Sequence, residues 1–287
     1  MFFQEKDKIK SKIVILKIQS KIVNRKSLIS QIVVILTKIF SVKVISITGD
    51  YVLLMLRVFT KPQKGKIFWQ RLMDEIQGLG IESIGIVAFI SAFMGAVVAI
   101  QTAYNIDSPF IPLSMVGFTV RQSVILEFSP TVISLILAGK VGSRIASEIG
   151  TMRVTEQIDA LEIMGVNSAN YLIFPKVVAS LLINPVLIVL SMWMGILGGW
   201  LAMSAFGLVT TTDYVKGIRI DFEAYTIFYA IMKTLFFAFI ISTVSGFYGY
   251  KTNGGALEVG QASTKAVVVS SIMIILFNLI LTQLLLT

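Results

Sequence analysis

The chain has 287 residues, of which 55% are hydrophobic and only 14% are charged, with a formal net charge of +9. A soluble globular domain has about 25% charged residues, so this composition argues against a water-soluble enzyme. The chain contains neither cysteine nor histidine, which excludes disulfide bonds, thiol chemistry, imidazole bases and the common zinc sites.

Residues 1–42 form a basic segment rich in Lys, Ile, Val and Ser that contains no glycine and no proline. Residues 1–78 carry 15 Lys/Arg against 5 Asp/Glu, so the positive charge of the chain is concentrated at this end. We expect 1–42 to be a poorly ordered or interfacial extension that lies on the cytoplasmic side, where basic residues accumulate. Nucleic-acid binding is the other standard interpretation of lysine-rich tracts, and the neighbouring apolar segments argue against it.

Residues 43–78 have the pattern of an amphipathic helical segment that lies in the plane of the headgroups. The apolar side chains near one face are Val52, Leu53, Leu56 and Phe59, and the basic ones opposite are Arg57 and Lys61. Pro62 interrupts this pattern, so we expect a break there before a second short helical stretch.

Five long apolar segments follow, and about 20 apolar residues suffice to cross a bilayer as a helix. The predicted spans are 80–104, 115–141, 174–204, 225–249 and 264–286. In the first span, the small residues Ser91, Gly95, Ala99 and Ala103 recur at four-residue spacing, which favours close approach of another helix. The sequence therefore predicts an all-α integral membrane protein with about five transmembrane helices.

Three charged residues lie inside predicted spans and well away from their ends: Arg121, Glu127 and Lys233. Glu127 and Lys233 lie at comparable depths, roughly 16 Å and 12 Å from the outer side at 1.5 Å per residue. Because a charge within the bilayer is costly unless it is paired or hydrated, we expect both to line a substrate cavity and to pair. Arg121, nearer the outer end, is a weaker candidate for contact with a phosphate. A purely structural ion pair is an equally good interpretation of Glu127 and Lys233.

The polar stretch between the second and third spans predicts a short amphipathic helix from Thr155 to Gly165. Thr155 is placed to cap its start and Gly165 to end it, with Ile158, Leu161 and Met164 on one face. Such a helix is either an ordinary surface element or a coupling helix that docks on an ATPase subunit. Its candidate contact residues are Thr155, Glu156, Gln157, Asp159, Ala160, Leu161, Glu162 and Gly165.

This region and the two spans around it resemble the MlaE-type permease family, the membrane subunits of phospholipid-transporting ABC systems. The resemblance is carried by Leu126-Glu127-Phe128-Ser129-Pro130, Ala138-Gly139, Gly142-Ser143, Ala146-Ser147-Glu148-Ile149-Gly150-Thr151-Met152-Arg153, Asp159-Ala160-Leu161 and Gly254-Gly255-Ala256-Leu257-Glu258. It covers about residues 65–287. In the family, the position matching Glu127 is polar and faces the cavity, whereas Arg121 has no clear counterpart.

The resemblance implies a homodimer that holds a phospholipid in an outward-facing central pocket. The transporter would move phospholipids between the inner and outer membranes of a bacterium. Two cytoplasmic ABC ATPase subunits would bind ATP and Mg, and a periplasmic MCE-domain protein would receive or deliver the lipid. This chain has no G-x-x-x-x-G-K-[ST] phosphate loop, and no cofactor of its own is expected.

Loop charges orient the predicted spans. Arg144, Arg153 and Lys176 favour a cytoplasmic 142–176 loop, with the N-terminus inside and the C-terminus in the periplasm. Lys216 and Arg219 in the outer 205–224 loop are a mild objection. A small-solute ABC importer permease and a non-transporting membrane scaffold are the competing functions.

Overall fold

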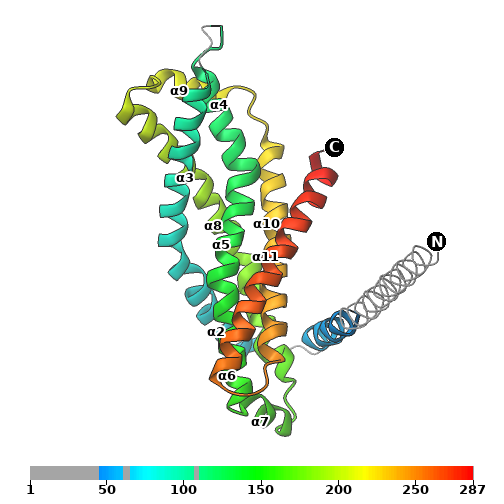
Figure 1. Ribbon diagram of the computed structural model, residues 1–287. Helices are drawn as coiled ribbons and strands as arrows, with labels where there is room; N and C mark the ends of the chain where they lie inside the picture. The colour runs from blue at the N-terminus through cyan, green and yellow to red at the C-terminus, as the bar shows by residue number, and fades with distance from the viewer. Residues whose placement is uncertain (1–44, 61–64, 107–109, 287) are drawn as a thin grey trace, which may run out of the picture. The chain divides into compact units, whose positions relative to one another are not determined.

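The computed structural model describes residues 45–60, 65–106 and 110–286 of the chain. By its internal contacts the chain divides into two compact units, residues 1–53 and 54–287. Within the described ranges all regular secondary structure is helical, as predicted. The predicted basic extension, 1–42, lies outside the described residues. The second unit by itself is a bundle of long helices (Figure 1).

Five helical stretches of the described chain are long and apolar enough to cross a membrane, which confirms the predicted number of spans. They are Gly65–Asn105, Ser114–Val154, Ser168–Phe206, Ala224–Tyr250 and Ala256–Leu285. Most of them extend beyond the predicted apolar spans, because a helix satisfies its own backbone hydrogen bonds and need not end where its side chains become polar.

The first stretch joins the predicted interfacial segment to the first span. Residues 45–59 are helical. After the gap at 61–64, helix α2 (Gly65–Glu75) continues through two irregular turns, η1 (Ile76–Gly80) and η2 (Ile81–Ser83), into α3 (Ile84–Asn105). The transition from amphipathic segment to span is thus a change of helical type, and the helix itself does not stop.

The second stretch carries the motif residues around Glu127 and alternates α- and π-helical segments. Its order is α4 (Ser114–Ser123), η3 (Val124–Val132), α5 (Ile133–Leu137), η4 (Ala138–Gly142) and α6 (Ser143–Val154). Pro130 lies inside η3. Proline lacks an N–H group and disturbs the regular ladder, so it favours a wider turn at this point.

The remaining helices are α7 (Gln157–Ile163), α8 (Ser168–Phe206), α9 (Thr211–Arg219), α10 (Ala224–Tyr250) and α11 (Ala256–Leu286). Helix α9 falls in the segment that we expected to be a loop, 205–224. Its start is capped by Thr210, whose Oγ accepts from the N–H of Asp213, and Lys216 and Arg219 lie in its last turn. Helices α7 and α9 lie at opposite ends of the bundle (Figure 1).

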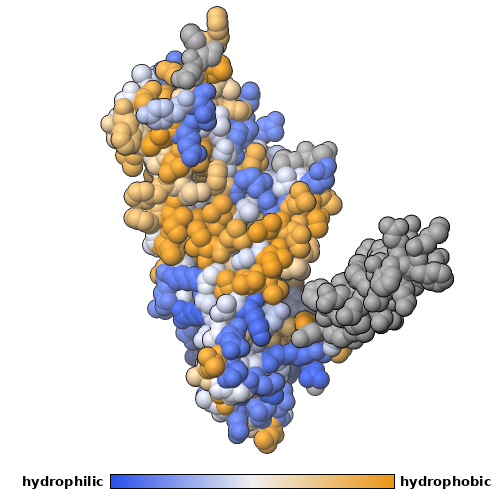
Figure 2. Space-filling view, viewed as in Figure 1, coloured by the Kyte–Doolittle hydropathy of each residue, from blue (hydrophilic) through white to orange (hydrophobic). Residues whose placement is uncertain are grey.

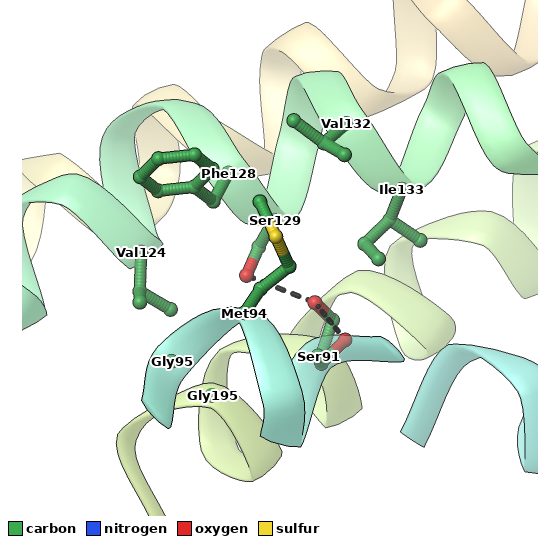
Figure 3. Close-up of a pocket in the computed structure, with 10 residues that line it drawn as sticks. Ser91, Met94, Gly95, Val124, Phe128, Ser129, Val132, Ile133 and Gly195 are labelled. Carbon is green, nitrogen blue, oxygen red and sulfur yellow. Dashed lines mark hydrogen bonds between the residues drawn. The ribbon is translucent and has the colours of Figure 1, made fainter. Parts of the chain in front are cut away.

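The small-residue stripe of α3 was expected to allow close approach of another helix, and in the structure that helix is α8. A methyl group at Gly95 would overlap the carbonyl of Gly195, and one at Gly198 would overlap the carbonyl of Ala92. Between these contacts Ser91 donates to Ser191 at 2.8 Å, and Ser191 donates to Ser129 of η3 at 3.0 Å. Figure 3 shows Ser91 and Ser129 at a small pocket that Ser191, Met94 and Phe128 also line. Three helices therefore meet in close contact beside Pro130.

On the face of the second unit shown in Figure 2, hydrophobic residues form a band across the middle, and hydrophilic residues gather at the end that carries α6 and α7. This distribution fits a bundle whose middle lies in lipid and whose α7 end lies in water.

Candidate functional site

The structure brings together the two charged residues that we expected to pair. Glu127 lies on η3 and Lys233 on α10, and the Lys233 Nζ is 2.9 Å from the Glu127 Oε1. The lysine side chain is completely buried, whereas the glutamate side chain is 43% exposed. The cation of this ion pair is therefore buried, whereas its carboxylate is partly accessible.

Hydroxyl groups surround the buried cation. Lys233 Nζ donates to the Tyr229 hydroxyl at 2.8 Å and to the Thr282 hydroxyl at 3.2 Å. It also lies 3.4 Å from the carbonyl oxygen of Leu126. A buried ammonium group is tolerated only when its donors are satisfied and its charge is balanced, and both conditions hold here.

The carboxylate of Glu127 is fixed from two further directions. Its Oε2 accepts from the Thr131 hydroxyl at 3.1 Å and from the Asn278 Nδ2 at 3.2 Å. The network therefore spans η3, α10 and α11. Sequence reasoning missed its polar members, although a signal was available: Tyr229, Thr131 and Thr282 each lie four residues from Lys233, Glu127 and Asn278 respectively, on the same helical face.

Arg121 lies apart from this network. It is 2% exposed, and its Nη1 donates to the carbonyl oxygens of Ile218 at 2.8 Å and Ile220 at 2.6 Å. Its Nη2 donates to the carbonyl of Asp221 at 3.2 Å. The structure thus does not place Arg121 with Glu127 and Lys233: the guanidinium fastens the chain after α9 to α4.

The short amphipathic helix predicted from Thr155 to Gly165 is present as α7, but its start differs from the prediction. Thr155 was expected to be its N-cap and instead ends α6, with its hydroxyl donating to the carbonyl of Thr151 at 2.9 Å. The prediction was wrong because α6 continues to Val154, beyond the apolar part of the second span. Glu156 then turns the chain with a φ of 60°, and α7 begins at Gln157.

The end of α7 agrees with the prediction. Gly165 has a φ of 76°, a conformation that glycine adopts without strain. Its N–H donates to the carbonyl of Glu162 at 2.9 Å, and the N–H of Val166 donates to that of Leu161 at 3.0 Å. These two bonds close the helix and direct the chain back towards α8.

Three side-chain contacts hold α7 against the bundle. Ile158 is fully buried, and Arg153 of α6 forms an ion pair with Asp159 at 2.6 Å. Glu162 accepts hydrogen bonds from the hydroxyls of Tyr250 and Ser168, both at 2.9 Å. The bond from Tyr250, followed by that from Ser168, lowers the pKa of Glu162 below its usual value of 4.5.

The outer surface of α7 is apolar at its tip. Ile163 is 87% exposed and Met164 is 67% exposed, and Val166 lies beside them. The expected apolar face is split, because Ile158 points into the protein while Met164 points outward. No Lys or Arg occurs between Val154 and Pro175, so the charged residues of this tip are all acidic. In the described part of the chain, no cluster of three or more acidic side chains could hold a metal ion.

Comparison with known proteins places these features in context. The family described as Permease MlaE matches residues 72–284. A probable ABC transporter permease protein of Rickettsia bellii is 35% identical over 237 residues, covering 82% of this chain and 91% of the relative. A probable ABC transporter permease protein of Synechocystis is 32% identical and covers 79% of this chain and 86% of the relative. The chloroplast protein TRIGALACTOSYLDIACYLGLYCEROL 1 of Arabidopsis thaliana is 31% identical, over 77% of this chain and 63% of its own length.

Proposed function

This chain belongs to the MlaE family of ABC transporter permeases, and we propose that it is the membrane subunit of a transporter that moves phospholipids between the inner and outer membranes of a bacterium. Two copies would form the permease, and a separate ABC ATPase would bind ATP and Mg and drive it. On the other side of the membrane, the partner would be an MCE-domain lipid-binding protein.

The observation that carries this proposal is the half-exposed carboxylate of Glu127 within an apolar span. A charged group in that position is costly in hydrocarbon, and it is stabilised where it faces a polar or hydrated cavity. Asn278, which donates to this carboxylate, lies on α11 among exposed apolar residues: Ile275, Leu276, Leu279 and Ile280. A polar centre beside an apolar wall suits an amphiphile, with its headgroup at Glu127 and its acyl chains along the helices.

A relative supports a lipid substrate. The Arabidopsis protein carries the name of a glycerolipid, trigalactosyldiacylglycerol, in its own name. A small-solute importer remains the competing function.

The ATPase is proposed to bind at α7. The exposed Ile163 and Met164 form an apolar tip that would fill a groove, in the manner of a helix-in-groove contact. Because the charges around the tip are acidic, the groove is expected to carry a basic rim.

The orientation follows from this placement. With the α7 end in the cytoplasm, the N-terminus would be cytoplasmic, as the positive-inside rule predicts, and the five candidate spans would put the C-terminus in the periplasm. Helix α9, and Phe110 in the connection between α3 and α4, would then face the MCE-domain partner. The membrane would be the bacterial inner membrane.

Replacing Glu127 tests the proposal. The complete transporter is purified with its ATPase and reconstituted in vesicles that contain a fluorescent phosphatidylethanolamine. Glu127→Gln keeps the shape of the side chain and leaves Lys233 bonded to Tyr229 and Thr282, but it removes the counterion of a buried cation, so transfer is measured per assembled complex. Lipid transfer should fall at least about tenfold, because the variant removes the charge that organises the polar network.

The control is Glu223→Gln, which neutralises an exposed carboxylate before α10 and should leave transfer unchanged. Wild-type transfer by Glu127→Gln would remove Glu127 from the mechanism. A wild-type complex that binds a soluble solute-binding protein, and that moves no phospholipid, would favour the importer.

A further inference from the structure

A second charged cluster lies in the half of the bundle that carries α7, away from Glu127. Its centre is Lys176 of α8, which is only 2% exposed. The Lys176 ammonium group forms an ion pair with Glu75 of α2 and another, at 2.8 Å, with Glu148 of α6. One buried cation thus joins three helices that are distant in the sequence.

A second basic residue, Arg144, joins α6 to the same helical stretch one turn before Glu148. Arg144 of α6 contacts Glu82 of η2 at 2.6 Å, and the same Nη1 donates to the carbonyl of Gly78 in η1 at 2.8 Å. A side chain at Gly78 would collide with this guanidinium group, so the absence of a Cβ makes room for the contact. Helix α6 is therefore tied at two levels to the helical stretch that precedes α3.

The position of these links along the chain gives them their meaning. Helix α6 leads into α7, and α8 leads out of it, so Glu148 and Lys176 lie on the two segments that carry the coupling helix. Helix α2 continues through η1 and η2 into α3, which packs against α8 beside the serine contacts of η3. A displacement of α7 thus has a direct route, through α6 and α8, to α2 and α3.

Aromatic contacts strengthen the attachment of α2 to α8. The Arg71 guanidinium lies 3.6 Å from the centre of the Tyr171 ring, and the rings of Phe68 and Phe174 are 5.5 Å apart. These contacts sit within two turns of the start of α8. Helix α2 is thus packed against α8 independently of Lys176, and the ionic links add the connection to α6.

We propose that Lys176 and its two carboxylates, Glu75 and Glu148, form a latch that transmits movement of the coupling helix to α2 and the first span. This inference rests on the proposed function, because it assigns α7 to the ATPase. Lys176 is a positioning residue: it acts on transport through the helices that it joins.

The energetics favour such a role over simple stabilisation. A buried ion pair gains little over well-packed apolar residues, because both charges lose their hydration, and its best-documented use is to fix one arrangement of helices. The two arms of the latch differ in exposure: the Glu75 side chain is 17% exposed and that of Glu148 is 45% exposed. The Glu148 arm can therefore be released to water at lower cost than the Glu75 arm.

The experiment uses the complete transporter with its ATPase, in vesicles that contain a fluorescent phosphatidylethanolamine. Glu148→Gln and Glu75→Gln each remove one arm, while Lys176 keeps the other. The matched control is Asp74→Asn, which neutralises the exposed neighbour of Glu75 on the same helix. The measured quantity is the amount of lipid transferred per ATP hydrolysed.

We expect both latch variants to assemble with the ATPase and to hydrolyse ATP, and to move about 2- to 30-fold less lipid per ATP, the range typical of residues that couple two sites. Asp74→Asn should keep the wild-type ratio. An unchanged ratio in both latch variants would overturn the proposal. So would a fall in the melting temperature of the complex with the ratio preserved, because that is the signature of a structural contact alone.

A second measurement, the signal of a fluorescent label at the end of α3, tests this inference independently of the proposed function. The chain has no cysteine, so Tyr104→Cys at the end of α3, where the native side chain is 69% exposed, accepts a fluorescent label at one place. We expect ATP to change the label signal, and Glu148→Gln to abolish that change. If wild-type vesicles moved no phospholipid, the proposed function would fail, and the label would still decide on the latch. A label that never responds to ATP, or that responds equally in Glu148→Gln, would overturn it.

Discussion

At the scale of single residues, the three charged residues within the spans are stabilised in two different ways. Lys233 is balanced by a carboxylate and hydroxyl groups, which the sequence shows as unusual polar residues in apolar spans. Arg121 is balanced by the backbone carbonyls of Ile218, Ile220 and Asp221. Every residue has a carbonyl, so no sequence signal marks these partners. This is why the pairing of Glu127 could be anticipated and the structural contacts of Arg121 could not.

Replacing Arg121 by methionine should therefore affect folding more than transport. Arg121→Met retains the apolar stem and leaves three carbonyls without their donor, each worth about 1–3 kcal/mol when buried. We expect a lower melting temperature and faster proteolysis between Ile220 and Ala224, with the lipid transferred per ATP unchanged in the protein that folds. Arg219→Met, at the exposed end of α9, serves as the control. Normal stability with lost transfer would instead place Arg121 in contact with lipid.

At the scale of helices, the apolar runs predicted the spans correctly, but the length of the polar ends of the helices was underestimated. Helix α6 extends to Val154, so Thr155 ends one helix and does not begin the next. Helix α9 was missed because it is short and polar and is held by distant contacts, such as the fully buried Tyr214 and its bond to the Ile196 carbonyl. The end of α7 was predicted correctly, because Gly165 provides a local signal that needs no partner.

The attachment of α7 should depend on pH through Glu162. Its pKa is lowered in the folded protein by hydrogen bonds from Tyr250 and Ser168, so the stability it contributes is fully present above the ordinary value of 4.5. That contribution is lost as the pH falls through the lowered folded pKa. A spin label at Ile163→Cys, on the exposed tip, should become more mobile in this range below pH 4.5.

The control for this prediction is Glu162→Gln in the same labelled protein, because glutamine resembles the protonated carboxyl group. Its label should already have the mobility of the acid form and should not change further over the same pH range. Identical titration curves in the two proteins would show that another group governs the attachment of α7.

At the scale of the whole described bundle, the features to which we assign proposed functions are separated along its length. The Glu127 network lies within the spans, and the apolar tip of α7 lies at one end, with the Lys176 latch between the tip and the first span. The Glu127–Lys233 pair and the short helix before α8 could be predicted from the sequence, because each has its own local pattern. The ion pair between Glu75 and Lys176 could be recognised only in the folded structure, because the two residues are 101 positions apart and both resemble ordinary loop charges in the sequence.

The assignment of α7 to the ATPase predicts a loss of assembly when its tip becomes charged. Met164→Glu and Ile163→Glu place a carboxylate where two exposed apolar side chains would be buried in a groove. A buried anchor of this kind contributes enough that its loss should weaken ATPase binding by at least about 30-fold, measured by titration of the purified permease with its ATPase. Phe110→Glu makes the same chemical change at an even more exposed apolar residue, at the α9 end, and should leave ATPase binding unchanged. If the ATPase bound the α7 variants as tightly as wild type, the coupling surface would have to lie elsewhere, and the latch would lose its input.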